Sequence, residues 1–272
     1  MSSDFVAEAD RTPAQRDAHA HAAELADELI DADALLLAIL PAIPLYNCAS
    51  TEEYAIHTRE RENAIMSSIS VIGLGGMARA IATRAVTGGN TVELIGRNAA
   101  NAEGLAAELG GGATAGTFGG VPAGDIVVLA VPYTSAVQVV AQYGDALADK
   151  VIIDITNTFN ADATGLVIPD GTSGAQEIAA AAPASAHVVK AFNTVFGHVL
   201  AQGIPLDVFF AGDDAHAVAS VSAFIESLGL RPLNVGGLEM ARWLEGAGPL
   251  LMGLARHGVG NFNIAFAVNV LG

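Results

Sequence analysis

Small residues near position 75 have the spacing that dinucleotide-binding proteins use to hold a pyrophosphate. Gly73, Gly75 and Ala78 form the pattern G-x-G-x-x-A between an apolar segment and a helical one. The first glycine permits a tight turn, the second lets backbone N–H groups approach a phosphate, and the small third residue lets helix and strand pack closely. The helix N-terminus would add unpaired N–H donors. A purely structural turn is the alternative. The predicted cofactor contacts in this turn are Gly73, Leu74, Gly75, Gly76 and Met77.

One arginine determines which nicotinamide cofactor is expected. The second predicted strand ends in Gly96-Arg97-Asn98. NAD-binding folds place an acid there for the ribose 2′-hydroxyl, but the nearby Glu93 lies too early on the strand. Arg97 instead offers a planar cation suited to a 2′-phosphate. We therefore predict NADP, bound by Gly96, Arg97 and Asn98, with an exposed loop arginine as the alternative.

Two later strand ends predict the nicotinamide side of the site. The strands predicted at 125–131 and 150–155 should end at the same edge of a parallel sheet, where a dinucleotide crosses. Short hydrogen-bonding side chains there suit carboxamide or ribose contacts, although they could equally be ordinary turn residues. The predicted contacts are Ala130, Val131, Pro132, Tyr133, Thr156 and Asn157.

The sequence offers no acid–base pair for catalysis. No Ser/His/Asp nucleophile set is visible, and the histidines lack metal-ligand spacing, so neither a catalytic side chain nor a metal is predicted. Lys190 follows a buried strand, and a catalytic role is one interpretation of it. The commoner case, which we expect here, is an ammonium group that reaches the surface along its aliphatic stem. His198 is the histidine nearest the proposed site. Direct hydride transfer between two bound rings would need positioning more than proton transfer.

Composition restricts the kind of partner. The chain has 272 residues, 52% of them hydrophobic, and a formal net charge of −17. This charge argues against nucleic acid or an anionic membrane as partner, and no apolar run approaches the roughly 18 residues that span a bilayer. With one cysteine, Cys48, no intramolecular disulfide can form, which fits a reducing cytoplasm. The acidity and the two lysines, Lys150 and Lys190, indicate either a high-salt cytoplasm or GC-rich coding.

Strand and helix patterns alternate from residue 69 onward, which predicts an α/β fold with a doubly wound, mostly parallel Rossmann sheet. A small helical and strand extension should follow it, and a helical extension should precede it. Three domains are predicted: 1–65 as an N-terminal extension that need not belong to the core enzyme, 66–192 as the NADP-binding Rossmann unit, and 193–272 as a substrate and dimerisation portion. A helix is predicted over 239–257. The apolar tail after it should pack in a homodimer interface or against the sheet. Strands are predicted at 69–73, 91–96, 125–131, 150–155, 187–192, 206–211 and 231–235, and helices at 76–87, 100–109, 134–147, 174–182 and 214–228.

Together these motifs resemble the coenzyme F420-dependent NADP oxidoreductase family over residues 68–258. The resemblance rests on the glycine turn, on Gly96-Arg97, and on segments 125–132, 209–214 and 229–236. It implies hydride transfer between NADPH and a bound small-molecule redox cofactor, the deazaflavin F420 or, as a weaker alternative, FAD or FMN. The residues that would border the deazaflavin are Asn193, Thr194, Val195 and Phe196.

Other activities remain open at this point. Residues 190–194 also resemble the cytosolic domain of ferric reductases in which NADPH reduces a flavin. An imine reductase of the pyrroline-5-carboxylate reductase type uses the same fold, but the segment after residue 194 is short for its helical dimerisation domain. A protein that senses NADP without turnover belongs to a different class.

Overall fold

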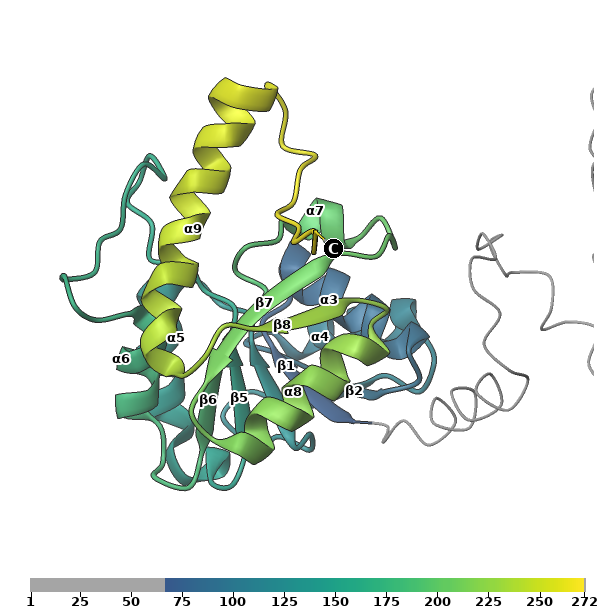
Figure 1. Cartoon of the computed structure of the whole chain (residues 1–272). Coiled ribbons are helices and arrows are strands. Elements are labelled where there is room, and N and C mark those ends of the chain that lie inside the picture. The colour runs from purple at the N-terminus through teal and green to yellow at the C-terminus, as the bar shows by residue number, and fades with distance from the viewer. Residues whose placement is uncertain (1–66, 272) are drawn as a thin grey trace, which may run out of the picture. The chain divides into compact units, whose positions relative to one another are not determined.

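The computed structural model describes residues 67–271 (Figure 1). The predicted extension over 1–65 lies outside the described residues. Within 67–271, eight strands form one sheet in the order β3-β2-β1-β4-β5-β6-β7-β8. The strands are β1 (Ser68–Ile72), β2 (Thr91–Gly96), β3 (Thr114–Thr117), β4 (Ile126–Leu129), β5 (Val151–Asp154), β6 (His187–Ala191), β7 (Asp207–Gly212) and β8 (Arg231–Asn234). The α-helices are α3 (Gly76–Thr87), α4 (Ala99–Leu109), α5 (Tyr133–Tyr143), α6 (Gly174–Ala181), α7 (Gly197–Leu200), α8 (Ala215–Ser227) and α9 (Ala241–Gly253).

Helices cover both faces of this sheet (Figure 1). Apolar residues of α3, α4 and α8 form one buried cluster with the strands, and those of α5 and α6 form a second cluster on the other face. All four residues of β4 are buried, because a strand covered on both faces carries a continuous apolar run. The α/β, doubly wound, mostly parallel fold is therefore confirmed.

The sheet departs from the predicted elements at its ends. β3 was not expected, because this four-residue edge strand is largely exposed and lacks an apolar pattern. β7 pairs antiparallel with β6, whereas β7 and β8 are parallel. Both β7 and β8 lie in the portion predicted to begin at residue 193, and they extend the same sheet as the strands before it.

Two predicted helices are interrupted. The helix expected over 134–147 ends at Tyr143, and a 3₁₀ turn, Gly144–Leu147, follows it. Gly144 begins that turn with a positive φ of 46°, a conformation that a continuous helix does not contain. The helix expected over 239–257 consists of a 3₁₀ turn (Leu238–Met240), α9 and a π-helical turn (Leu254–Val259).

The chain after the π-helical turn has no regular secondary structure and lies against α7 and the beginnings of β7 and β8. The Val268 N–H donates to Asp207 at 2.7 Å, and Arg231 donates to the Val268 carbonyl at 2.6 Å. Near α7, His198 Nε2 lies 3.0 Å from the Phe262 carbonyl oxygen. This tail therefore contacts the sheet, as one of the two predicted arrangements requires, while Val270 and Leu271 stay exposed.

Candidate cofactor site

The turn between β1 and α3 is held against the ends of β2 and β4. The Gly73 N–H donates to the Ile95 carbonyl at 2.8 Å, and Ala130 N–H donates to Ile72 at 2.8 Å. Gly73 has a φ of +117°, and a Cβ built on it would lie 2.1 Å from the Ala130 carbonyl oxygen. Only glycine fits this position, because any Cβ would meet backbone that cannot move away.

The next two glycines face open space. A Cβ on Gly75 or on Gly76 would meet nothing within 4 Å. No side chain caps α3 and its first turn holds no acidic residue, so the first N–H groups of this helix remain available. Ala78, at the third position of the fingerprint, is buried under the sheet. These features suit a pyrophosphate held by backbone donors at a helix N-terminus.

This turn opens into a pocket of about 630 Å³ at the point where the strand order reverses between β1 and β4. Ligands of doubly wound sheets bind at such a switch point. The pocket brings together nine of the predicted contacts: Gly73, Leu74, Gly75, Gly96, Arg97, Asn98, Ala130, Val131 and Pro132. Five further lining residues were not predicted: Ile95, Asn101, Phe118, Ser135 and Val139. The other predicted contacts, Gly76, Met77, Tyr133, Thr156 and Asn157, do not line this pocket.

The far end of the pocket carries polar groups suited to a 2′-phosphate. Arg97 is exposed at the pocket rim. Asn98 caps α4, since its Oδ1 accepts from the Asn101 N–H at 3.3 Å, and this leaves its amide Nδ2 as a donor. Asn101 could have been found in the sequence as a second amide three residues after the cap. Glu93 is engaged elsewhere, because its carboxylate accepts from Ser70 Oγ at 2.6 Å.

At the carboxyl ends of β5 and β6, the prediction for Lys190 is wrong. Its ammonium group does not reach the surface: the residue is 0% exposed. Lys190 Nζ lies 2.7 Å from Asp154 Oδ2 and 2.9 Å from Glu245 Oε1, and donates to the Thr156 carbonyl at 2.7 Å. The misjudgement came from treating the strand end as solvent-exposed, whereas α9 covers it and supplies Glu245.

The predicted residues beside this ion cluster are held by hydrogen bonds. Asn193 Nδ2 donates to Asn157 Oδ1 at 3.0 Å and to the Leu244 carbonyl at 2.7 Å. Asn157 Nδ2 donates back to the Asn193 carbonyl at 3.0 Å. Four buried side-chain polar atoms have no hydrogen-bond partner among the described residues, and three of them lie here, at the ends of β5 and β6: Thr156 Oγ1, Asn193 Oδ1 and Thr194 Oγ1. Since buried polar atoms are normally paired, these atoms suit a polar ligand at this edge of the sheet.

The residue that directly follows β6 has a left-handed backbone conformation. Phe192, which directly follows β6, has a φ of +61° and is fully buried. Such a conformation is strained for a bulky side chain and persists only where the surrounding structure enforces it. The Phe192 ring packs edge-on to Phe224 at 6.4 Å, which anchors the turn in the core. Strained residues of this kind concentrate at functional sites.

The last two predicted acceptor contacts differ in environment. Val195 is buried in the hydrophobic core. Phe196 lies nearer the surface, stacked on His198 with ring centroids 5.6 Å apart and edge-on to Phe262 of the tail at 5.8 Å. Phe196 and its aromatic neighbours are therefore the better placed to meet a planar ring.

Tyr133, at the start of α5, donates its hydroxyl to Glu177 Oε2 at 2.7 Å. Burial, together with this hydrogen bond and the charges of Glu177 and Glu245, raises the pKa of Tyr133 to about 12. The phenol therefore stays protonated at neutral pH and acts as a hydrogen-bond donor and not as a base.

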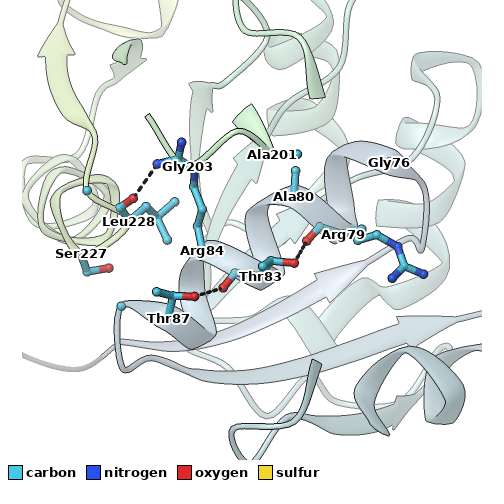
Figure 2. A pocket seen from close by; sticks show the side chains of 12 residues that line it. Gly76, Arg79, Ala80, Thr83, Arg84, Thr87, Ala201, Gly203, Ser227 and Leu228 are labelled. Carbon is cyan, nitrogen blue, oxygen red and sulfur yellow. Dashed lines mark hydrogen bonds between the residues drawn. The ribbon is translucent and has the colours of Figure 1, made fainter. Parts of the chain in front are cut away.

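A second pocket, of about 530 Å³, lies on the outer side of α3 and beside the end of α8 (Figure 2). Arg84 lies at its floor, and all three guanidinium nitrogens donate to main-chain carbonyls: Nε to Leu200 at 2.7 Å, Nη1 to Leu228 at 3.0 Å and Nη2 to Ile204 at 2.7 Å. Thr83 and Thr87 bond back to the helix carbonyls four residues earlier. The polar groups around this pocket are thus satisfied within the fold.

Within the described part of the chain, no group of three or more His, Cys, Asp or Glu side chains could hold a metal ion. Among the helices of residues 67–271, none has the length and apolar character needed to cross a membrane.

Comparison with known proteins agrees with this geometry. Residues 68–158 match the family described as NADP oxidoreductase coenzyme F420-dependent. Through these residues the chain is similar to the F420-dependent NADP oxidoreductase family. The match spans β1 to β5 and so includes the glycine turn, Arg97 and the strand ends that line the larger pocket. The predicted family resemblance is confirmed.

Two relatives and one structure illustrate the range of similar proteins. An F420-dependent NADP reductase of Methanocaldococcus jannaschii is 29% identical over 139 residues, which are 48% of this chain and 62% of that protein. Metalloreductase STEAP3 of Rattus norvegicus is 30% identical over 183 residues, which are 65% of this chain and 35% of that protein. The chain thus spans less than two thirds of the length of either relative.

A crystal structure from Arthrobacter sp. FB24, provisionally described as an F420-dependent NADP-reductase, has a TM-score of 0.67 at 24% identity. The likeness covers 75% of this chain and 100% of that chain. At this level of identity it establishes the shared fold.

Proposed function

We propose that the chain is an oxidoreductase that transfers a hydride between NADPH or NADP and a bound deazaflavin, F420. The observation that carries the NADP part is the pocket at the β1–β4 switch point, which joins the open glycine turn to Arg97. Backbone N–H groups of α3 would hold the pyrophosphate, and Arg97, Asn98 and Asn101 would surround the 2′-phosphate.

The acceptor side would lie at the ends of β5 and β6. The unpartnered polar atoms of Thr156, Asn193 and Thr194 offer hydrogen bonds to the planar amide edges of a nicotinamide or a deazaflavin. Phe196 would pack against the acceptor ring. The bound cofactors supply the redox chemistry. These side chains hold the two rings in position and exclude water, which is what direct hydride transfer requires of a protein.

The choice of F420 as acceptor is supported by the family match over residues 68–158 and by the archaeal relative. The likeness to rat Metalloreductase STEAP3 favours a second candidate, transfer of NADPH electrons toward a ferric acceptor through a flavin. The two candidates share the NADP pocket and differ only in the acceptor.

An acceptor panel tests both candidates. The protein is mixed anaerobically with NADPH, and then with F420, FAD, FMN or ferric citrate, and the loss of nicotinamide absorbance is followed in a single turnover. F420 should react fastest, and NADH should be a much poorer donor. Fastest reaction with FAD or FMN and ferric citrate would favour the second candidate. Binding of NADPH without oxidation by any acceptor would indicate a sensing protein and overturn the proposal.

We also propose a cytoplasmic homodimer. Large apolar side chains stay exposed along α9 and the turn after it, with Trp243 66%, Leu250 60% and Leu254 40% exposed. A second copy packing there would bury them, since exposed apolar patches of this kind mark interaction surfaces. Sedimentation equilibrium of the full chain tests this, with Leu250→Glu expected to shift the dimer toward monomer. A monomeric wild-type protein at micromolar concentration would contradict it.

A further inference from the structure

The ion cluster formed by Asp154, Lys190 and Glu245 contains one more carboxylate than its cation can neutralise. All three residues are 0% exposed, and Lys190 Nζ lies within 2.7 Å of Asp154 and 2.9 Å of Glu245. One ammonium group and two carboxylates leave a net charge of −1 away from solvent. A fold that needed only to neutralise Lys190 would require one carboxylate.

Both carboxylates accept hydrogen bonds from further donors. Besides Lys190, Asp154 accepts from the Thr156 N–H at 2.8 Å. Glu245 accepts from Thr158 Oγ1 at 2.9 Å and from the Gly174 N–H at 3.1 Å. Gly174 is the first residue of α6, and a helix N-terminus stabilises an anion. Every one of these partners is a donor, so neither carboxylate needs a proton to complete its hydrogen bonds.

The cluster adjoins the edge at which the nicotinamide would lie. It holds Thr156 from two sides, because Asp154 accepts from its N–H and Lys190 donates to its carbonyl. On the other side, a Cβ on Gly174 would lie 3.1 Å from the Tyr133 ring. The charge of Glu245 is among the influences that raise the pKa of Tyr133, after burial and Glu177. The charge of Glu245 thus acts on Tyr133, the first residue of α5.

A net negative charge acts differently on the two redox states of nicotinamide. The reduced ring is neutral, and it becomes a cation when a hydride, one proton with two electrons, leaves C4 for the acceptor. Buried charges act strongly on such a change, because the local dielectric constant is low. We propose that the Asp154–Lys190–Glu245 cluster makes this site bind the oxidised, cationic nicotinamide in preference to the reduced one, and so favours hydride donation by NADPH. The inference rests on the proposed function, in that NADP must bind with its ring at this edge.

The test compares affinities and needs no turnover. Dissociation constants of NADP⁺ and NADPH are measured by titration calorimetry for the wild type, Glu245→Gln and Asp154→Asn. Each variant removes one negative charge, from α9 or from β5, with little change of shape. The ratio of the NADP⁺ constant to the NADPH constant should rise about three- to thirty-fold in both variants, as expected for a charge acting over several ångströms at an intermediate dielectric constant.

Three controls separate charge from structure. Glu245→Asp keeps the charge and should keep the wild-type ratio. Glu226→Gln removes an exposed carboxylate on α8 and should change nothing. The affinity for 2′,5′-ADP, which lacks the nicotinamide, should be the same in all variants.

Two outcomes would overturn the inference alone: an unchanged ratio in folded Glu245→Gln and Asp154→Asn, or equal weakening of both cofactors. Should the variants fail to fold, the wild type still decides the matter, because it must bind NADP⁺ more tightly than NADPH, and the reverse order would overturn the inference. A wild type that binds neither cofactor would instead overturn the proposed function, and the inference would fall with it.

Discussion

Arg84 is expected to be the most stabilising single side chain on α3. The residue is 8% exposed, and its guanidinium donates to three separate carbonyls, at the end of α7, in the loop after it and at the end of α8. A cation at two helix C-termini also opposes their partial negative charge. The perturbation we consider is Arg84→Met, which keeps most of the aliphatic stem and removes all five N–H donors.

The magnitude follows from these contacts. A hydrogen bond from a charged donor contributes about 1.5–3 kcal/mol, so three bonds set an upper range of about 4.5–9 kcal/mol. The adjoining pocket, of about 530 Å³, admits water to the freed carbonyls, and removing the guanidinium also removes its own desolvation cost. We therefore expect Arg84→Met to lower the free energy of unfolding by about 3–5 kcal/mol, in the range measured for breaking buried charged contacts. Arg84→Lys should fall between the variant and the wild type.

Urea unfolding followed by circular dichroism measures this change. The matched control is Arg79→Met, on the same helix and on the same pocket (Figure 2). Arg79 pairs with Glu108, but its side chain is 47% exposed, so its loss should cost less than about 1 kcal/mol. If Arg84→Met costs no more than Arg79→Met, the three carbonyl contacts do not stabilise the fold and the reasoning is refuted.

Four further predictions concern the cofactor site and the solution behaviour. Arg97→Ala should weaken NADPH about ten- to a hundred-fold and leave NADH nearly unchanged in titrations, since a charge-assisted contact to the 2′-phosphate is lost; equal losses would refute this role. Gly73→Ala should destabilise the protein by at least about 2 kcal/mol and abolish NADPH binding, whereas Gly75→Ala should melt like the wild type. The hydrogen bonds from Arg231 hold the pKa of Asp207 below its ordinary value. These bonds therefore stabilise the fold above about pH 4, and the stabilisation is lost as pH falls further. In urea titrations, Asp207→Asn should lose less stability between pH 6 and pH 3 than the wild type. With a net charge of −17, the melting temperature should be several degrees higher in molar KCl than in about 0.1 M KCl, and a flat profile would contradict the high-salt interpretation of the composition.

Local sequence was sufficient for the parts of the site that one strand and the turn after it determine. Gly73 is required by backbone geometry alone, and its position between an apolar strand and a small-residue helix predicted the turn. Arg97 could be assigned to the pocket because it directly follows β2, whose buried run was visible in the sequence. Both cases depend on contacts between residues close in the chain, or on the regular alternation that fixes a doubly wound sheet.

The buried ion cluster around Lys190, at the ends of β5 and β6, could be predicted only from the tertiary structure. From the sequence alone, Lys190 is predicted to be a surface lysine. In the structure, α9 places Glu245 against it, and no local sequence pattern links a helix near the C-terminus to the end of β6. The left-handed Phe192 and the antiparallel β7 are likewise enforced by packing from distant segments. Hydrophobic periodicity indicates which side of a helix or strand is buried, but it does not indicate which charged residue from a distant part of the chain contacts that side. The sequence by itself therefore determined the fold class and the glycine turn after β1, whereas the burial of Lys190 and its contacts with Asp154 and Glu245 were decided only by the tertiary structure.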